Sequence, residues 1–252
     1  MQSRRLLILG FVLAMGVLWT VASADMKVLF YEYEKSPQHF FNVTKKEVPQ
    51  AGGEQIKYEL TTDAQKGLKL DNLKKYDMVL FGTHAIGGWS TYHLEGVEED
   101  LIAYVKEGGF ILTQTNDDSF YKGDMFPVEL KMRESGDHDY EVTPEGKELG
   151  IFDKPNKVGN LIEDDSYFDV EKPWVVLAKS KGTNTPHTLL LNHGIGEYVV
   201  TSTRADGNVG QAETNVPLVE NVVNYFVKRV KEVRSVEPAN KLATYWGAIK
   251  RD

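Results

Sequence analysis

The sequence has no cysteine among its 252 residues. This absence excludes disulfide bonds, thiolate metal sites and any mechanism that needs a cysteine nucleophile. Basic residues are also in deficit, since 29 Lys and Arg stand against 37 Asp and Glu and the formal net charge is −8. Nucleic-acid binding depends on cations that neutralise phosphates. We therefore expect no nucleic-acid partner.

Long apolar runs are scarce, and the one present lies at the N-terminus. Arg4 and Arg5 precede an apolar run over residues 6–21, and small residues occupy positions 22 and 24. This three-part pattern is typical of a cleavable signal peptide. The alternative is a membrane anchor, but the run is shorter than the roughly 20 residues that span a bilayer. We predict a signal peptide over residues 1–24, the general secretion route rather than the twin-arginine route, and a secreted or periplasmic mature protein without a membrane span.

Short apolar segments alternate with helical patterns in the first half of the remaining chain. The predicted strands cover residues 26–31, 56–61, 77–82 and 110–115. Apolar residues recur at helical spacing over residues 94–105, and Gly108-Gly109 is expected to stop this helix before the fourth strand. Strands that alternate with helices predict a parallel sheet covered on both faces.

The second half follows a different pattern. Periodicity is weak over residues 116–173, which predicts a partly irregular excursion with a solvated acidic loop at residues 163–165. Two strands at 174–179 and 188–192 precede a glycine-containing turn at 193–196, and a hairpin into a strand at 197–202 is expected. A helix over 216–233 should pack back on the sheet. We predict one domain over residues 25–235 and a C-terminal tail over 236–252, with Pro238 near the boundary.

Three segments carry a resemblance to a known superfamily. They are Gly82-Thr83-His84 after the third strand, the stretch at residues 104–110 before the fourth, and the glycine turn and strand at residues 193–200. Their order resembles the class I glutamine amidotransferase-like superfamily, and most nearly its ThuA-like (trehalose-utilisation-type) branch or a related exported branch. The resemblance implies a flavodoxin-like three-layer α/β sandwich with a mostly parallel central sheet and a C-terminal hairpin and helix.

The superfamily's nucleophile does not carry over to this chain. Its amidotransferases place a cysteine on the turn after the strand that corresponds to residues 110–115, whereas this turn reads Asn116-Asp117-Asp118-Ser119. A carboxylate or amide cannot act as a thiolate does. Ser119 lacks the G-x-S-x-G frame of a serine hydrolase. We therefore expect no glutaminase activity.

Candidate site residues follow from the predicted sheet. Ligands of open parallel sheets lie outside the carboxyl ends of the strands, and these ends converge if strands one, three and four are neighbours. The predicted acid/base or metal-ligating residues are His84, Asp117 and Asp118, and the predicted ligand-binding residues are Glu32, Glu34, His39, Thr83, Trp89, Asn116 and His193.

Each candidate also has a structural explanation. Asp117 or Asp118 can cap the turn or the next helix, and His84 can bond to backbone at a strand end. His39 can lie on the surface, Trp89 can pack in the core, and His193 can serve the hairpin turn. The residues 83–92, which contain two glycines beside an aromatic, are predicted to form a lip over the crevice.

Three functions are consistent with these patterns. The first is a domain that binds a small polar or carbohydrate-derived ligand. The second is a metal-assisted or carboxylate-based sugar hydrolase or isomerase, and the third is a non-catalytic scaffold of the cell envelope. No cofactor is predicted, and the sequence leaves open whether the protein is an enzyme, whether it binds a metal, and what its oligomeric state is.

Overall fold

The fold is described from a computed structural model of the chain. The structure describes residues 25–33, 39–82, 85–88, 91–114, 124–159, 163–168, 170–203 and 212–249. Within these ranges, none of the helices combines the length and the apolar character that a membrane crossing requires.

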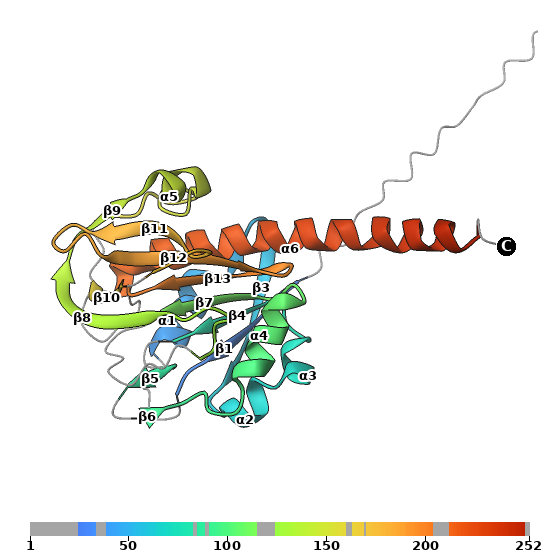
Figure 1. Cartoon of the computed structure of the whole chain (residues 1–252), viewed down its shortest axis with the longest axis horizontal. Helices are drawn as coiled ribbons and strands as arrows, with labels where there is room; N and C mark the ends of the chain where they lie inside the picture. Colours follow the sequence, from blue (N-terminus) through green and yellow to red (C-terminus); the bar gives the residue numbers. More distant parts are fainter. Residues whose placement is uncertain are drawn as a thin grey trace, which may run out of the picture.

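The central feature is a nine-stranded mixed sheet (Figure 1). Its parallel part has the order β3 (Glu54–Thr61), β1 (Met26–Tyr31), β4 (Met78–Phe81), β7 (Phe110–Gln114) and β13 (Gly196–Thr201). All four residues of β4 and all five of β7 are buried, as expected for strands covered on both faces. The first, third and fourth predicted strands are neighbours, which confirms the flavodoxin-like order.

The sheet continues beyond β13 with antiparallel strands. These are β12 (Pro186–His193), β11 (Val175–Ser180) and β9 (Tyr140–Val142), and a short strand β2 (Gln50–Ala51) lies at the opposite edge. His193 pairs with Gly196 across the turn between β12 and β13, and Gly194 has a φ of 64° there. The predicted C-terminal hairpin is therefore confirmed.

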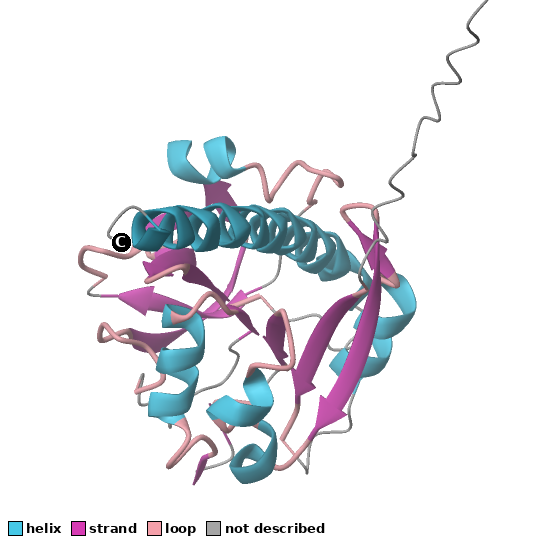
Figure 2. Ribbon diagram, turned by 90° about the vertical axis from the view of Figure 1, so that its right-hand side faces the viewer, coloured by secondary structure: helices cyan, strands magenta, loops and turns pink. Residues whose placement is uncertain are grey.

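Helices cover both faces of the sheet and enclose two hydrophobic cores. One core lies between the sheet and the helices α1 (His39–Glu47) and α6 (Ala212–Ile249). The other contains residues of α4 (Glu98–Lys106), α2 (Ala64–Gly67) and α3 (Leu70–Leu73). Figure 2 shows the strands between these helical layers. The three-layer sandwich predicted from the sequence is confirmed.

The excursion between β7 and β11 is more ordered than its periodicity predicts. It contains β8 (Lys131–His138), which pairs antiparallel with β10 (Glu163–Phe168), and the helix α5 (Pro144–Leu149). The Thr143 side chain caps α5 by accepting a hydrogen bond from the Gly146 N–H. Residues 163–165 therefore belong to a strand and not to a loop. The sequence does not predict this strand because its side chains show no apolar alternation, and it forms because its backbone hydrogen-bonds to β8. The predicted lip contains a second small pair, β5 (Gly87–Gly88) with β6 (Thr91–Tyr92).

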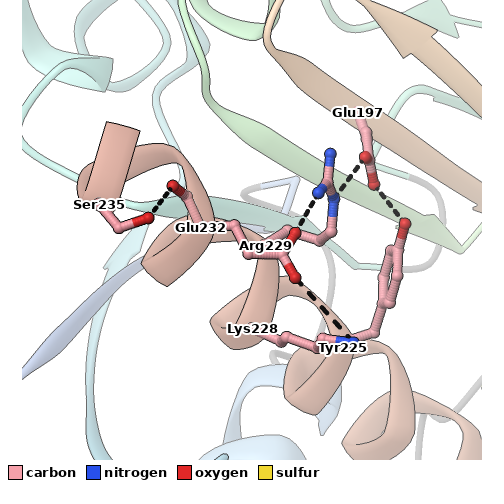
Figure 3. A network of polar contacts seen from close by, with 6 residues as sticks. All are labelled: Glu197, Tyr225, Lys228, Arg229, Glu232 and Ser235. Atoms are coloured by element: carbon pink, nitrogen blue, oxygen red, sulfur yellow. Dashed lines mark hydrogen bonds and ion pairs between the residues drawn. The ribbon is translucent and has the colours of Figure 1, made fainter. Parts of the chain in front are cut away.

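Side chains of the last helix, α6, hydrogen-bond to a buried glutamate of the sheet. Glu197 of β13 is 2% exposed, and its carboxylate accepts hydrogen bonds from Tyr225 Oη and Arg229 Nε, each at 2.7 Å (Figure 3). Arg229 also pairs with Glu232 in the next turn of α6. A buried carboxylate is costly unless it is paired and hydrogen-bonded, and both conditions are met here. This network therefore holds α6 against the beginning of β13.

Helix α6 is longer than the predicted helix. It runs from Ala212 to Ile249 and passes through Pro238 without a break. Figure 1 shows its last part projecting beyond the sheet toward the C-terminus. The backbone is thus helical on both sides of the predicted boundary between the domain and the tail, and the boundary stays a prediction.

Candidate functional site

A row of buried residues crosses the sheet where the parallel strands end. Tyr31 pairs with Phe81, and Phe81 pairs with Thr113. The next residues along β1 and β4, Glu32 and Gly82, therefore align with Gln114 of β7. The row continues because Gln114 pairs with Thr201 and Thr201 pairs with Thr188. Since side chains alternate along a strand, the row faces the same side as the core under α1 and α6.

Glu32 occupies one end of this row and is fully buried. Its Oε1 accepts a hydrogen bond of 2.6 Å from the Phe41 N–H, in the first turn of α1. A carboxylate is stabilised there because the N–H groups of a first helical turn point toward it. Gly82 leaves space for this side chain, since a Cβ built on Gly82 would lie 2.8 Å from Glu32 Cγ. The Glu32 side chain is therefore held in place by α1 and has room because β4 carries no side chain at Gly82.

Hydroxyl and imidazole groups form the other end of the row. Thr188 Oγ1 lies 3.0 Å from Thr201 Oγ1 and 2.7 Å from His187 Nδ1. His187 Nε2 lies 2.8 Å from Thr203 Oγ1. All four side chains are buried, with exposed fractions of 2% or less. They therefore form one buried chain of hydrogen bonds next to Gln114.

His187 is neutral in this chain of hydrogen bonds. Burial lowers the pKa of its imidazole to about 3, against the opposing attraction of Asp139. A neutral imidazole has one donor and one acceptor nitrogen, which suits the two threonine hydroxyls on either side. This end of the row is therefore polar but uncharged.

Aromatic side chains lie beside the same end of the sheet. Tyr33 follows Glu32, and its ring stacks on that of His93 with centroids 3.6 Å apart. The His93 N–H also donates a hydrogen bond to Ile86 O. Burial raises the pKa of Tyr92, and the nearby carboxylates of Glu98 and Asp124 raise it further. The stacked pair thus connects the small β5–β6 sheet to the end of β1.

Most of the residues predicted from the sequence lie outside the described residues. These are Glu34, Thr83, His84, Trp89, Asn116, Asp117 and Asp118. His39 is the first residue of α1, so its backbone belongs to the helix that contacts Glu32. Among the described residues, no three His, Asp or Glu side chains are grouped as metal ligands would be.

His193 is not brought to this end of the sheet. It pairs with Gly196, the first residue of β13, whereas Thr201 of the row is the last residue of β13. The five residue steps from Gly196 to Thr201 correspond to about 16 Å along a strand. Burial lowers the pKa of His193, and the cation of Lys106 lowers it further. Glu32 is a predicted site residue that lies in the row. His193 was predicted as well, but it lies at the opposite end of the sheet.

The remaining members of the row were not predicted. They lie where apolar strands border polar segments, at the ends of β7 and β13 and at the start of β12. These residues are Gln114, Thr201, Thr203, His187 and Thr188. For Gln114 and Thr201, the signal is a polar residue with the same parity as the buried positions before it. This signal alone does not tell which strands are neighbours.

Comparison with known proteins adds evidence on the fold alone. No protein-family model matches the chain, and no curated protein matches it. Solved structures do match it over most of its length.

A candidate GMP synthase subunit from Thermoplasma acidophilum matches with a TM-score of 0.54 and 12% identity, covering 85% of this chain and 98% of that one. A ThuA-like protein from Bacteroides uniformis matches with a TM-score of 0.54 and 15% identity, covering 84% and 96%. A cytoplasmic protein of Salmonella typhimurium matches with a TM-score of 0.54 and 15% identity, covering 80% and 99%. With the strand order described above, these likenesses show that the chain has the flavodoxin-like fold of class I glutamine amidotransferase-like and ThuA-like proteins.

Proposed function

We propose that the protein binds a small polar, carbohydrate-derived ligand at the carboxyl ends of β1, β4, β7 and β13. The observation that carries the proposal is the buried polar row from Glu32 to Thr188. In open α/β sheets, ligands bind in the crevice outside these strand ends. A buried row of polar side chains at that position costs stability that an apolar row would not, which supports a functional reason for it.

The chemistry of the row suits a ligand rich in hydroxyl groups. Glu32 supplies a hydrogen-bond acceptor, Gln114 supplies a donor and an acceptor, and the threonines supply hydroxyls. Tyr33 adds an aromatic ring at the same end of β1, where it stacks on His93, and aromatic rings pack against the apolar faces of sugars. Pockets with few, well-placed polar groups are typical of small-molecule sites.

The first test of this function uses Glu32→Gln. The amide keeps an oxygen that can accept from the Phe41 N–H, so the fold should persist, but the charge that strengthens hydrogen bonds to a ligand is lost. We expect the dissociation constant for the bound sugar to rise about tenfold or more, because a hydrogen bond to a charged group contributes about 1.5–3 kcal/mol. Thermal melts and calorimetry against glucose, galactose, mannose and xylose measure this.

Glu99→Gln is the matched control, since Glu99 lies exposed on α4, and it should bind as the parent does. The proposal is contradicted if no sugar raises the melting temperature of the parent, or if Glu32→Gln and the parent bind equally. A rise that requires a divalent cation instead favours the metal-assisted hydrolase.

We also propose that the protein is exported and that cleavage leaves Asp25 as the first residue. The basic, apolar and small-residue pattern of residues 1–24 supports this proposal. The strand β1 begins at Met26, so cleavage at this position keeps the whole strand. The full-length chain is expressed in a bacterium, and the mass of the protein in the extracytoplasmic fraction is measured. Retention of residues 1–24, or recovery in the cytoplasm alone, overturns the proposal.

A further inference from the structure

Gln114 ends β7 at the centre of the polar row, between Gly82 and Thr201. The residue is 2% exposed. Within the described part of the chain, neither its Nε2 nor its Oε1 has a hydrogen-bond partner, and no other side chain there has two such buried atoms. Its neighbours differ in this respect, because Thr201, Thr188 and His187 bond to one another. The carboxamide thus stands apart from the hydrogen-bonded groups beside it.

Leaving a buried donor and acceptor without partners costs free energy that an apolar side chain of the same size avoids. Gln114 sits on the core-facing side of β7, in line with Phe110 and Leu112. A methionine would fill this position without the cost. The packing of the described residues therefore gives no reason for an amide at this position.

The groups around Gln114 limit the charge of that ligand. Gly82 separates Gln114 from Glu32, and two neighbouring strand spacings amount to about 10 Å. Within the row, the described residues include a carboxylate but no cation, and His187 beside it is neutral. An anionic group next to Gln114 would find no opposite charge among the described side chains of this row. A neutral group with a paired donor and acceptor fits the amide better.

We infer that Gln114 determines the specificity of the site by hydrogen-bonding two adjacent hydroxyl groups of an uncharged sugar or polyol. One hydroxyl accepts from Nε2, and the other donates to Oε1. The inference rests on the proposed function and names its ligand class: neutral vicinal diols are preferred over sugar phosphates and sugar acids.

The experiment compares the parent with Gln114→Met. Binding of glucose, galactose, mannose and xylose is measured by calorimetry, with glucose 6-phosphate and gluconate as the anionic probes, and melting temperatures are recorded without ligand. We expect Gln114→Met to melt about 2–4 °C above the parent, because two unsatisfied groups are removed. We expect it to bind the preferred neutral sugar at least tenfold more weakly.

Gln114→Asn is the second variant. Asparagine keeps the carboxamide, but its side chain is one methylene shorter. Binding should therefore weaken while the unliganded protein remains folded.

The outcomes separate the inference from the proposed function. If the parent binds a neutral sugar and Glu32→Gln weakens it, but both Gln114 variants bind normally, the inference is wrong and the proposed function stands. Preference of the parent for glucose 6-phosphate or gluconate also overturns the inference while a ligand site remains. If the parent binds none of the probes, both fail.

Discussion

Between pH 6.5 and pH 4.5, the free energy of unfolding is expected to fall by about 2 kcal/mol through His187 alone. In the unfolded chain this imidazole takes up a proton near its ordinary pKa of about 6.5. In the folded protein, burial lowers the pKa to about 3. The unfolded state thus binds more protons in this range. The stabilisation is fully present above pH 6.5 and is lost as the pH falls toward 3.

The charged groups near His187 do not cancel this effect. Asp139 lies close enough to attract a protonated imidazole, but its carboxylate is paired with Lys181, which lowers the pKa of Asp139. Asp139 therefore remains charged throughout the same range and contributes little to the slope. The two threonine hydroxyls that contact the imidazole do not titrate.

Urea unfolding at several pH values, with the parent and His187→Gln compared, measures the effect. Glutamine can donate and accept hydrogen bonds but cannot take up a proton in this range, so its curve should be flatter by about 2 kcal/mol between the two pH values. Carboxylates elsewhere contribute equally to both proteins. Parallel curves for the two proteins would show that His187 is not the residue responsible.

Replacing Gly196 by alanine is expected to destabilise the fold by about 3 kcal/mol, at the upper end of the usual cost of overpacking. A Cβ on Gly196 would lie 2.0 Å from the Gly109 carbonyl oxygen and 2.3 Å from the Val105 carbonyl oxygen. These are backbone atoms, so no side chain can rotate away. The start of β13 would have to move away from the end of α4.

Gly159→Ala is the control, because a Cβ at Gly159 meets nothing within 4 Å and its backbone is not left-handed. Chemical denaturation of both variants measures the difference. Equal midpoints for Gly196→Ala and Gly159→Ala would contradict the close approach of the two backbone segments.

Two glycine-containing turns show what local sequence patterns can predict and what they cannot. Gly108-Gly109 is predicted as a helix stop and residues 193–196 as a hairpin turn, and both predictions are confirmed. Their local roles do not reveal that the two turns touch. Ile195 N–H donates to Lys106 O, and Glu197 N–H donates to Gly109 O. A close approach between segments this distant in the chain depends on the parallel pairing of β7 with β13, which no local signal encodes.

For the candidate site, too, the sequence predicts the position of one residue and not that of another. Glu32 is predicted because it follows a buried strand, and the neighbouring order of β1, β4 and β7 is what the resemblance to flavodoxin-like domains implies. His193 is predicted on the same side, yet the hairpin reverses the chain and places it at the other end of β13. An antiparallel strand carries the residues after it away from the edge where parallel strands end.

Periodicity, glycine positions and composition are enough to predict the alternation of strands and helices, the buried parallel sheet, the hairpin and the absence of thiol chemistry. All of these are local or global properties of the chain, so they can be taken from the residues alone. The alignment of Gln114, Thr201 and Thr188 with Glu32 is different, because it appears only in the folded sheet. That alignment depends on strand register, which the packing of two whole sheet faces sets, and a shift of one residue would turn each of these side chains to the opposite face.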